Sequence, residues 1–363
     1  MLSFGPDIRE QVSRARNDLR MGVPILLRAD QDALLIPAET LMDQRLNDLR
    51  IVSEEILLVL TAKRALTLKI GAYDKDLVRI ILPNNAELDW IKSVADPSDD
   101  IKSPLKGPFK CKRQGDVLTE RLALNLIKSA QLLPAAIVTY VEKAEKLIQK
   151  NNLTVLNIEK TTPLLLEEVI LSDIVSAKLP IEAGGMGRLH VFRPMNGSEE
   201  HYALQIGKPP QSKPVLVRIH SACFTGDVLG SLKCDCGLQL KSALRQMAVS
   251  GSGILLYLNQ EGRGIGLANK MRAYSLQNEG FDTVEANHRL GFEDDERDFR
   301  VAASILKGLG ITNIQLMTNN PDKIFMMERN GITVSDRVAL TCNLNKHNQA
   351  YMATKAKKSG HLL

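Results

Sequence analysis

The sequence predicts an α/β protein of two domains, and three observations support this prediction. Its 363 residues are enough for two domains of ordinary size. The second half alternates short apolar runs with longer amphipathic segments, a pattern typical of strands and helices packed in layers. The histidines and cysteines are unevenly distributed, since the first 189 residues contain one cysteine, Cys111, and no histidine. Metal and acid–base chemistry is therefore expected in the second half.

The first half reads as a mixed α/β domain. Short apolar runs predict strands at 22–29 and 33–38, and the segment 54–68 predicts a helix. A second helix is predicted at 119–133, where apolar residues follow helical spacing at Leu122, Leu126, Ala130 and Leu133. A buried strand at 134–141 and a helix at 144–153 follow. Pro and Gly become frequent near 180–187, and we place the domain boundary at 170–180.

The second half alternates strand and helix. Strands are predicted at 215–221, 253–258 and 313–318. Helices are predicted at 238–247, 267–280, 298–310 and 319–331. The last of these has Pro321 in its first turn and Gly331 past its end, the usual positions for these residues. We expect these elements to form α/β layers.

The composition is that of a soluble globular protein, with 44% apolar and 25% charged residues. A net charge of +5 suits a small anionic ligand but is too diffuse to indicate nucleic acid. The first residues lack the charged and apolar regions of a signal peptide, and no apolar run approaches the roughly 18 residues of a membrane span. We therefore expect a cytoplasmic protein without nucleic-acid or membrane partners.

Three of the five cysteines lie close together in the pattern C-x10-C-x-C, at Cys223, Cys234 and Cys236. Structural zinc sites usually have four protein ligands, whereas catalytic zinc keeps three and leaves one position to water. The spacing therefore favours catalytic zinc. Two alternatives stay open, namely a closed site with His220 as the fourth ligand and cysteines that are simply buried.

The neighbouring segments carry groups that suit an anion. Arg218, His220, Ser221 and Thr225 surround the first cysteine. A glycine-rich loop at 261–266 contains Arg263, and arginine recognises phosphate bidentately. A strand end that opens a helix near 318–323 is a natural anion site. The charged run at 293–298 is read as a solvated surface unless further evidence gives it a role.

Together these segments closely resemble GTP cyclohydrolase II. The resemblance runs from about residue 179 to 363 and rests on five ordered blocks, "VRIHSACFTGDVLGSLKCDCG", "LYLNQEGRGIGLANKMRAYSLQ", "GFDTVEANHRLGFEDDERDF", "LMTNNPDK" and "YMATKAKKSGHLL". The family converts GTP into 2,5-diamino-6-(5-phospho-D-ribosylamino)pyrimidin-4(3H)-one, formate and diphosphate, the first committed step of riboflavin biosynthesis. The resemblance implies the same hydrolase activity here.

The resemblance also implies roles for individual residues. It implies one zinc ion per subunit on Cys223, Cys234 and Cys236, with water as the fourth ligand. Tyr274 matches the tyrosine needed for ring opening, and Asp295 and Arg297 match a proposed proton acceptor and nucleophile at the α-phosphorus. Because a guanidinium stays protonated in proteins, Arg297 is equally read as a phosphate clamp. Mg²⁺ with the triphosphate and a homodimer are further expectations from the family.

Contacts with GTP carry over to a set of matching positions in the second half. These are Arg218, Ile219, His220, Ser221, Ala222, Gln239, Glu261, Gly262, Arg263, Thr283, Thr318 and Lys323. Many members have glutamate where this chain has Ala222, so the side-chain contact expected there is missing.

The first half resembles 3,4-dihydroxy-2-butanone 4-phosphate synthase more faintly, in segments near 14–41 and 116–138. Its catalytic residues do not survive, since the late motif's histidine falls at Leu118 and the early acidic signature is reduced to "ADQDALLIP". We therefore predict a degenerate, inactive synthase-like domain at 1–175 and a cyclohydrolase domain at 176–363. The alternatives are a bifunctional enzyme, a non-catalytic zinc and nucleotide sensor, and a related cyclohydrolase with a different product.

Overall fold

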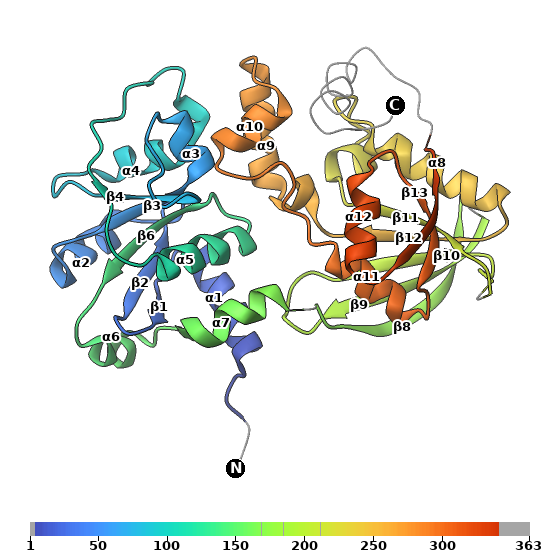
Figure 1. Ribbon diagram of the computed structural model, residues 1–363, viewed down its shortest axis with the longest axis horizontal. Helices are drawn as coiled ribbons and strands as arrows, with labels where there is room; N and C mark the ends of the chain where they lie inside the picture. Colours follow the sequence, from blue (N-terminus) through green and yellow to red (C-terminus); the bar gives the residue numbers. More distant parts are fainter. Residues whose placement is uncertain (1–3, 168, 184, 211, 341–363) are drawn as a thin grey trace. The chain divides into compact units, whose positions relative to one another are not determined.

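The computed structural model describes residues 4–167, 169–183, 185–210 and 212–340 (Figure 1). The described chain forms two compact units. The first unit contains the chain up to Glu167 together with Ala268–Glu296, and the second contains the remainder. The block at 351–363 lies outside the described residues. The predicted split of the chain into two families at 175/176 stays a prediction. The N-terminal stretch of the first unit ends at Glu167.

The first unit is built on a mixed sheet, seven-stranded among the described residues, in the order β5-β4-β3-β6-β2-β1-β7. All neighbours pair antiparallel except β1 and β7, which are parallel. The strands are β1 Ile25–Arg28, β2 Ala33–Pro37, β3 Leu57–Thr61, β4 Leu77–Ile81, β5 Cys111–Lys112, β6 Ala135–Tyr140 and β7 Val155–Asn157. Every residue of β2 and β3 is buried, so helices must cover both faces.

Helices cover this sheet on its two faces, which gives three layers. One core packs α1 (Ile8–Arg20) and α5 (Leu118–Ser129) with α7 (Ile158–Leu166). The core on the other face includes residues of α2 (Asp43–Val52), α3 (Ala62–Thr67), α4 (Leu88–Ala95) and α6 (Ala144–Asn151). Leu122 and Leu126 of α5 are buried, which confirms the predicted apolar face. The added segment contributes α9 (Leu267–Asn278) and α10 (Thr283–Arg289).

The second unit has a sheet in the order β14-β13-β11-β12-β10-β9-β8. Its first four strands are parallel and the last three are antiparallel to their neighbours. The strands are β8 Leu171–Ile181, β9 Gly185–Pro194, β10 His201–Ile206, β11 Val215–Ser221, β12 Gly253–Leu258, β13 Asn313–Met317 and β14 Thr333–Val338. Helices α11 (Arg300–Gly308) and α12 (Asp322–Arg329) pack in one core and α8 (Cys236–Val249) in another. The α/β class is confirmed.

One predicted element is wrong in part. The segment 54–68 is not a single helix, because β3 occupies Leu57–Thr61 before α3 begins at Ala62. A strand buried on both faces is a continuous apolar run, which periodicity alone does not distinguish from a buried helix.

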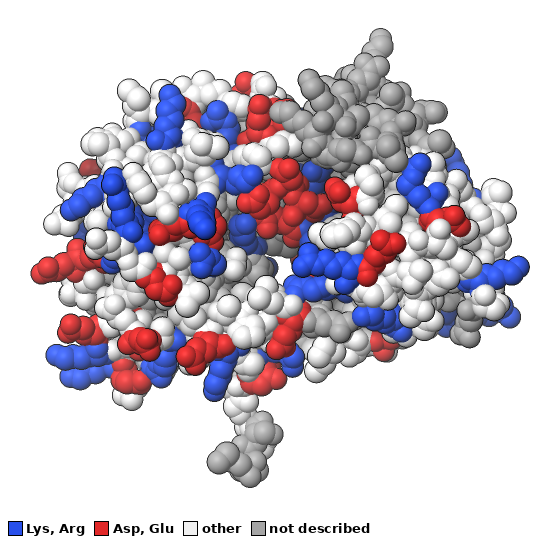
Figure 2. Space-filling model, in the orientation of Figure 1, with Lys and Arg blue, Asp and Glu red and all other residues white. Residues whose placement is uncertain are grey.

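Charged side chains of both signs lie on the face of the molecule drawn in Figure 2. Basic and acidic side chains alternate over this face, with no single basic surface there.

Candidate active site

The predicted site residues of the second unit gather at the carboxyl ends of three parallel strands. β11 ends at Ser221, which is in register with Leu258 at the end of β12, and β13 ends at Met317 on the other side of β11. Loops that leave neighbouring parallel strands meet at one edge of the sheet, which is where α/β proteins bind ligands. The sheet therefore collects segments that are about 100 residues apart in the sequence.

The three predicted zinc ligands converge at this edge. Cys223 follows β11, Cys234 lies in the next loop, and Cys236 begins α8. Their sulfur atoms all lie within 4.8 Å of one another, and the Sγ atoms of Cys223 and Cys234 are 3.7 Å apart. Zn–S bonds of about 2.3 Å in tetrahedral geometry place two sulfurs roughly 3.8 Å apart. The donor set and its spacing therefore fit a zinc ion.

A glycine closes the cradle around these sulfurs. Gly226 lies in the π-helical turn η2 (Phe224–Val228), and its amide donates to Cys223 Sγ at 3.3 Å. A Cβ at this position would meet Cys234 Sγ at 2.7 Å and Cys223 Sγ at 3.1 Å. The backbone approaches the sulfurs more closely than any other residue could, so the turn is shaped around the thiol group.

The crowding of the thiols affects their protonation. Hydrogen bonding with Cys223 raises the pKa of Cys234, and the two neighbouring thiols and burial raise the pKa of Cys236 well above its usual range. A divalent cation reverses this preference, because its charge favours the thiolate form. Crowded, largely buried thiols without a disulfide are thus suited to a metal.

Asp227 organises the segment that carries Cys223. Its Oδ2 accepts hydrogen bonds from the Cys223 amide and from the Tyr257 hydroxyl, both at 3.0 Å. The same oxygen lies 3.0 Å from Nε2 of the buried His220. Burial lowers the pKa of His220, and burial and Asp227 raise the pKa of Tyr257, so the neutral hydroxyl is the donor. Neither Asp227 nor Tyr257 belongs to the cysteine spacing, so the sequence pattern did not indicate them.

Two cations at the predicted GTP positions are buried and bonded to the protein itself. Arg218 donates to the Met317 carbonyl at 2.9 Å and to Gln239 Oε1 at 2.5 Å. Lys323 donates to the Ile219 carbonyl at 3.0 Å. Thr318 is buried beside them, and its hydroxyl accepts from the Asn320 amide. These bonds hold the ends of β11 and β13 together and keep positive charge at this edge.

The glycine-rich loop after β12 has an unusual backbone. Gly262, Arg263, Gly264 and Gly266 all have φ between 62° and 94°. A left-handed conformation at a residue such as arginine costs on the order of 1 kcal/mol, and such strain tends to mark a functional loop. Glu261 begins this turn, and its Oε2 accepts from the Phe224 amide at 2.6 Å. Glu261 thereby connects the loops after β12 and β11.

Arg297 joins the same edge through Ser221, to whose Oγ its Nη1 donates at 3.3 Å. Ala222 lies next to it, and its amide donates to the Leu258 carbonyl at 2.7 Å. The guanidinium of Arg297 also lies 5.0 Å from the centre of the Phe299 ring.

Three predicted site residues belong to the first unit instead. Tyr274 lies in α9, half-buried, with Lys270 Nζ 5.6 Å from its ring centre. Thr283 begins α10, where Gln277 donates to its hydroxyl at 3.4 Å. Asp295 lies in an exposed loop. The structure brings the cysteines and Arg297 to one sheet edge, and the roles of Tyr274, Thr283 and Asp295 stay predictions.

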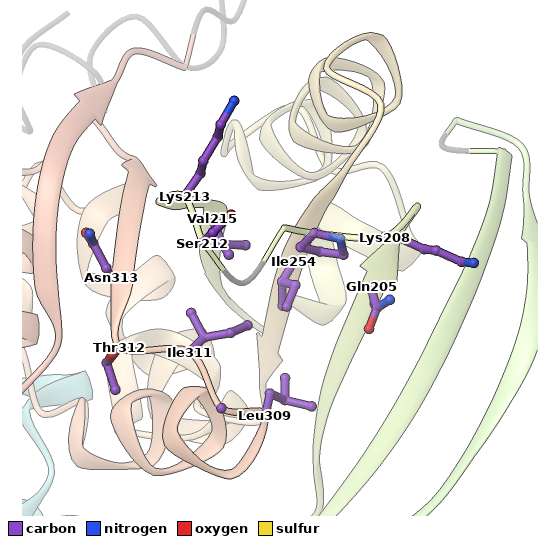
Figure 3. Close-up of a pocket in the computed structure, with 12 residues that line it drawn as sticks. Gln205, Lys208, Ser212, Lys213, Val215, Ile254, Leu309, Ile311, Thr312 and Asn313 are labelled. Carbon is purple, nitrogen blue, oxygen red and sulfur yellow. The ribbon is translucent and has the colours of Figure 1, made fainter.

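A cavity of about 280 Å³ lies at the opposite edge of the second sheet (Figure 3). Its lining includes Val215, Ile254 and Asn313, which lie at the amino ends of the strands. Lys208 and Lys213 extend away from the other lining side chains in Figure 3, so no charged groups converge on it. This cavity is distinct from the cysteine cluster.

Comparisons with known proteins agree with this site. The family model described as GTP cyclohydrolase II matches residues 172–339. The chain is 40% identical over 310 residues to GTP cyclohydrolase-2 of Azospirillum brasilense, covering 84% of this chain and 80% of that protein. It is 55% identical over 190 residues to GTP cyclohydrolase-2 of Azotobacter vinelandii, covering 52% of this chain and 91% of that protein.

A solved structure of a two-domain 3,4-dihydroxy-2-butanone 4-phosphate synthase from A. baumannii is also similar. It covers 92% of this chain and 99% of that chain at 16% identity, with a TM-score of 0.33, which is too low to support an argument about the fold. The sequence relatives support a stronger conclusion, because the A. brasilense protein is 40% identical over 84% of this chain. The chain belongs to the GTP cyclohydrolase II family of enzymes.

Proposed function

We propose that the protein hydrolyses GTP to 2,5-diamino-6-(5-phospho-D-ribosylamino)pyrimidin-4(3H)-one, formate and diphosphate, the first committed step of riboflavin biosynthesis. The observation that carries this proposal is the convergence of three thiols, two of them 3.7 Å apart, in a chain of this family. A non-catalytic sensor is the weaker reading, because it has no need of the tyrosine, aspartate and arginine that match the reaction.

Zinc dependence is part of the proposal. Cys223, Cys234 and Cys236 would hold the ion, and their spacing and the cradle at Gly226 support this. Three protein ligands are typical of catalytic rather than structural zinc. A zinc ion bound there supplies a Lewis acid that lowers the pKa of water toward about 7. Asp227 fixes the Cys223 backbone through its amide, so it would orient this ligand.

Arg297 acts as a phosphate clamp in this proposal. The planar, cationic fork of an arginine side chain suits a phosphate in the transition state. The bond to Ser221 holds it at the edge where Arg218 and Lys323 keep further positive charge. Asp295 serves as proton acceptor and Tyr274 as the hydrogen-bond donor or proton shuttle for ring opening. Covalent attack by Arg297 is the alternative, and trapping a phosphoramidate would establish it.

The GTP contacts are proposed at the positions given in the sequence analysis. The left-handed backbone of the loop at 262–266 and the cations at the sheet edge support an anionic ligand there. Mg²⁺ accompanies the triphosphate, since a hard cation suits phosphate oxygens. We further propose a homodimer and a cytoplasmic location. Within the described residues, every helix is too short or too polar to cross a bilayer.

The first half is proposed to lack activity on ribulose 5-phosphate. Enolisation of that substrate needs a base and a metal site, and the first 189 residues contain no imidazole. Leu118 replaces the family histidine, and Glu120 beside it is fully buried and accepts from the Tyr140 hydroxyl at 3.0 Å. Incubating the full chain with ribulose 5-phosphate and Mg²⁺ should give no formate above a no-protein blank. Clear turnover would support a bifunctional enzyme instead.

The zinc proposal is tested with Cys234→Ser and a matched control. A serine hydroxyl is a poorer zinc ligand than a thiolate, so we expect the variant to lose zinc and formate release. Cys111→Ser, which changes a half-buried cysteine of the first unit, should keep both. Metal content by mass spectrometry and formate release from GTP are the measurements. Full activity of Cys234→Ser in the presence of a chelator would contradict catalytic zinc.

A further inference from the structure

The segment Ala268–Glu296 lies within the residues matched by the cyclohydrolase family, yet it packs in the first unit with the N-terminal half. It contains Tyr274 and Asp295, two of the residues proposed for the reaction. The contacts between this segment and the N-terminal half are therefore relevant to the function of the N-terminal half.

Arg272 makes the first of these contacts. Its Nη2 lies 2.9 Å from Glu39 Oε1 and its Nε lies 3.0 Å from Asp96 Oδ2. Its Nη1 donates to Asn269 at 2.7 Å, and the fully buried Asn269 donates to the Gln131 carbonyl at 3.0 Å. One arginine thus joins two carboxylates of the N-terminal half, with all three side chains less than a third exposed.

The contact face and Tyr274 point in different directions around α9. Residues two apart on an α-helix are separated by about 200°. Arg272 therefore holds the helix by one face while Tyr274 lies on nearly the opposite one. An anchor on this face fixes the rotation of the helix, and so the direction of the Tyr274 side chain, without contacting the ring.

A second contact holds the loop that leads to Asp295. The buried Thr61 hydroxyl donates to the Gly291 carbonyl at 2.8 Å. A Cβ on Gly291 would lie 2.9 Å from both Thr61 Oγ1 and Pro134 Cγ, so only glycine allows this approach. Beyond it, Lys63 pairs with Glu293 at 3.2 Å and Lys128 pairs with Glu296 at 2.6 Å. The loop is tethered on both sides of Asp295.

A third contact is a buried charge network. Asp100 pairs with Arg64 at 2.5 Å and with Lys106, and Arg289 of α10 lies 3.6 Å from it. Burial alone would raise the pKa of Asp100, but the hydrogen bonds and charges of Arg64 and Lys106 lower it. Isolated surface ion pairs contribute little, whereas breaking a buried network is strongly destabilising. The combined contacts are therefore expected to stabilise the packing of 268–296 against the N-terminal half.

We propose that the N-terminal half is a positioning domain for the cyclohydrolase reaction, which holds the segment 268–296 in the conformation that its tyrosine and aspartate need. Glu39, Asp96 and Thr61 are its positioning residues. This inference rests on the proposed function, since Tyr274 and Asp295 take their roles from it. It also accounts for the retention of a domain whose synthase residues are lost.

The test uses the full chain with Glu39→Gln combined with Asp96→Asn, which keeps side-chain size and removes both charges that face Arg272. The matched control is Glu145→Gln, which removes an ion pair with Arg28 in the same unit and leaves the carboxylates that face Arg272 unchanged. Hydrogen–deuterium exchange of peptides from 268–296 reports anchoring. Formate release from GTP gives kcat and KM. Zinc content reports whether the cysteine cluster of the second unit is intact.

We expect faster exchange in 268–296 and a fall in kcat of about tenfold or more, because small displacements of a catalytic group have large effects on rate. The KM for GTP and the zinc content should change far less. Unchanged exchange, or faster exchange with an unchanged kcat, would overturn the inference. So would the same loss of kcat in Glu145→Gln, which would indicate general destabilisation.

Thr61 supplies a milder test in case the double variant folds poorly. Thr61→Val removes the hydroxyl that binds Gly291, whereas Thr61→Ser keeps it, so Thr61→Ser should retain kcat where Thr61→Val loses it. Equal effects of the two changes would contradict a positioning role. A wild-type chain without turnover of GTP would refute the proposed function itself, whereas normal wild-type turnover with unchanged variants would refute only the positioning inference.

Discussion

Gly226→Ala tests whether the cysteine cradle is built for a metal. Gly226 is buried in the turn after Cys223, and its φ is not in the left-handed region, so alanine causes no backbone strain there. The added methyl group would instead meet the Cys234 sulfur at 2.7 Å. The change therefore isolates the close approach of the backbone to the sulfurs.

The size of the effect follows from this distance. Ordinary contacts of a Cβ begin at 3.4 Å, so the Cys234 sulfur must move by 3.4 − 2.7 = 0.7 Å if the backbone stays in place. Metal–ligand distances tolerate only about 0.2 Å. We expect zinc affinity to fall by at least 10- to 100-fold, roughly the scale seen when groups that support metal ligands are lost. Formate release should fall with it.

The assay is a competition between the protein and a chelator, with bound zinc and formate release measured together. Gly308→Ala is the matched control, since its Cβ would meet only Phe192 at 3.7 Å in the same unit. It should bind zinc as the wild type does. An unchanged zinc affinity in Gly226→Ala would show that the sulfurs are not held for a metal, and would refute the reasoning.

Three further predictions concern pH and the reaction. Burial lowers the pKa of His201 from 6.5 to about 4, so the unfolded state binds more protons between these values. The contribution of His201 to the free energy of unfolding is fully present above about pH 6.5 and is lost as the pH falls toward 4, by about 2 kcal/mol at pH 5. Thermal melts should show a smaller loss of stability at low pH in His201→Gln than in the wild type, and equal losses in the two proteins would contradict this. Tyr274→Phe should still release diphosphate while formate release falls by ~10²-fold; a parallel fall of both would indicate binding instead. Arg297→Lys loses the planar fork, which should lower turnover, but it keeps the positive charge, so substantial residual turnover is expected of a clamp. A trapped phosphoramidate on Arg297 would contradict the clamp.

The strands at the site were predictable because each is bounded by clear signals. The apolar runs at 215–221 and 253–258 coincide with β11 and β12. By contrast, the hairpin of β8 and β9 was missed, since most of β8 is exposed and lacks a buried apolar face. Strand prediction depends on such a face, so a solvated hairpin gives little signal.

The site itself was predictable where spacing carries the chemistry. The cysteine pattern led to Cys223, Cys234 and Cys236, which the structure brings together. Asp227 and Tyr257 were not predictable in this way, because their roles arise from hydrogen bonds between the turn after β11 and strand β12. The packing of 268–296 with the N-terminal half was also hidden, since it depends on contacts such as that of Arg272 with Glu39, 233 residues apart.

The central claim, that this chain performs the GTP cyclohydrolase II reaction, is tested most directly by product analysis. The full chain is incubated with GTP labelled with ¹³C at C8, in the presence of zinc and Mg²⁺, and the products are analysed by mass spectrometry. We expect labelled formate, diphosphate and unlabelled 2,5-diamino-6-(5-phospho-D-ribosylamino)pyrimidin-4(3H)-one in equal amounts. A product that retains the label at C8, or no turnover by a zinc-loaded chain, would contradict it.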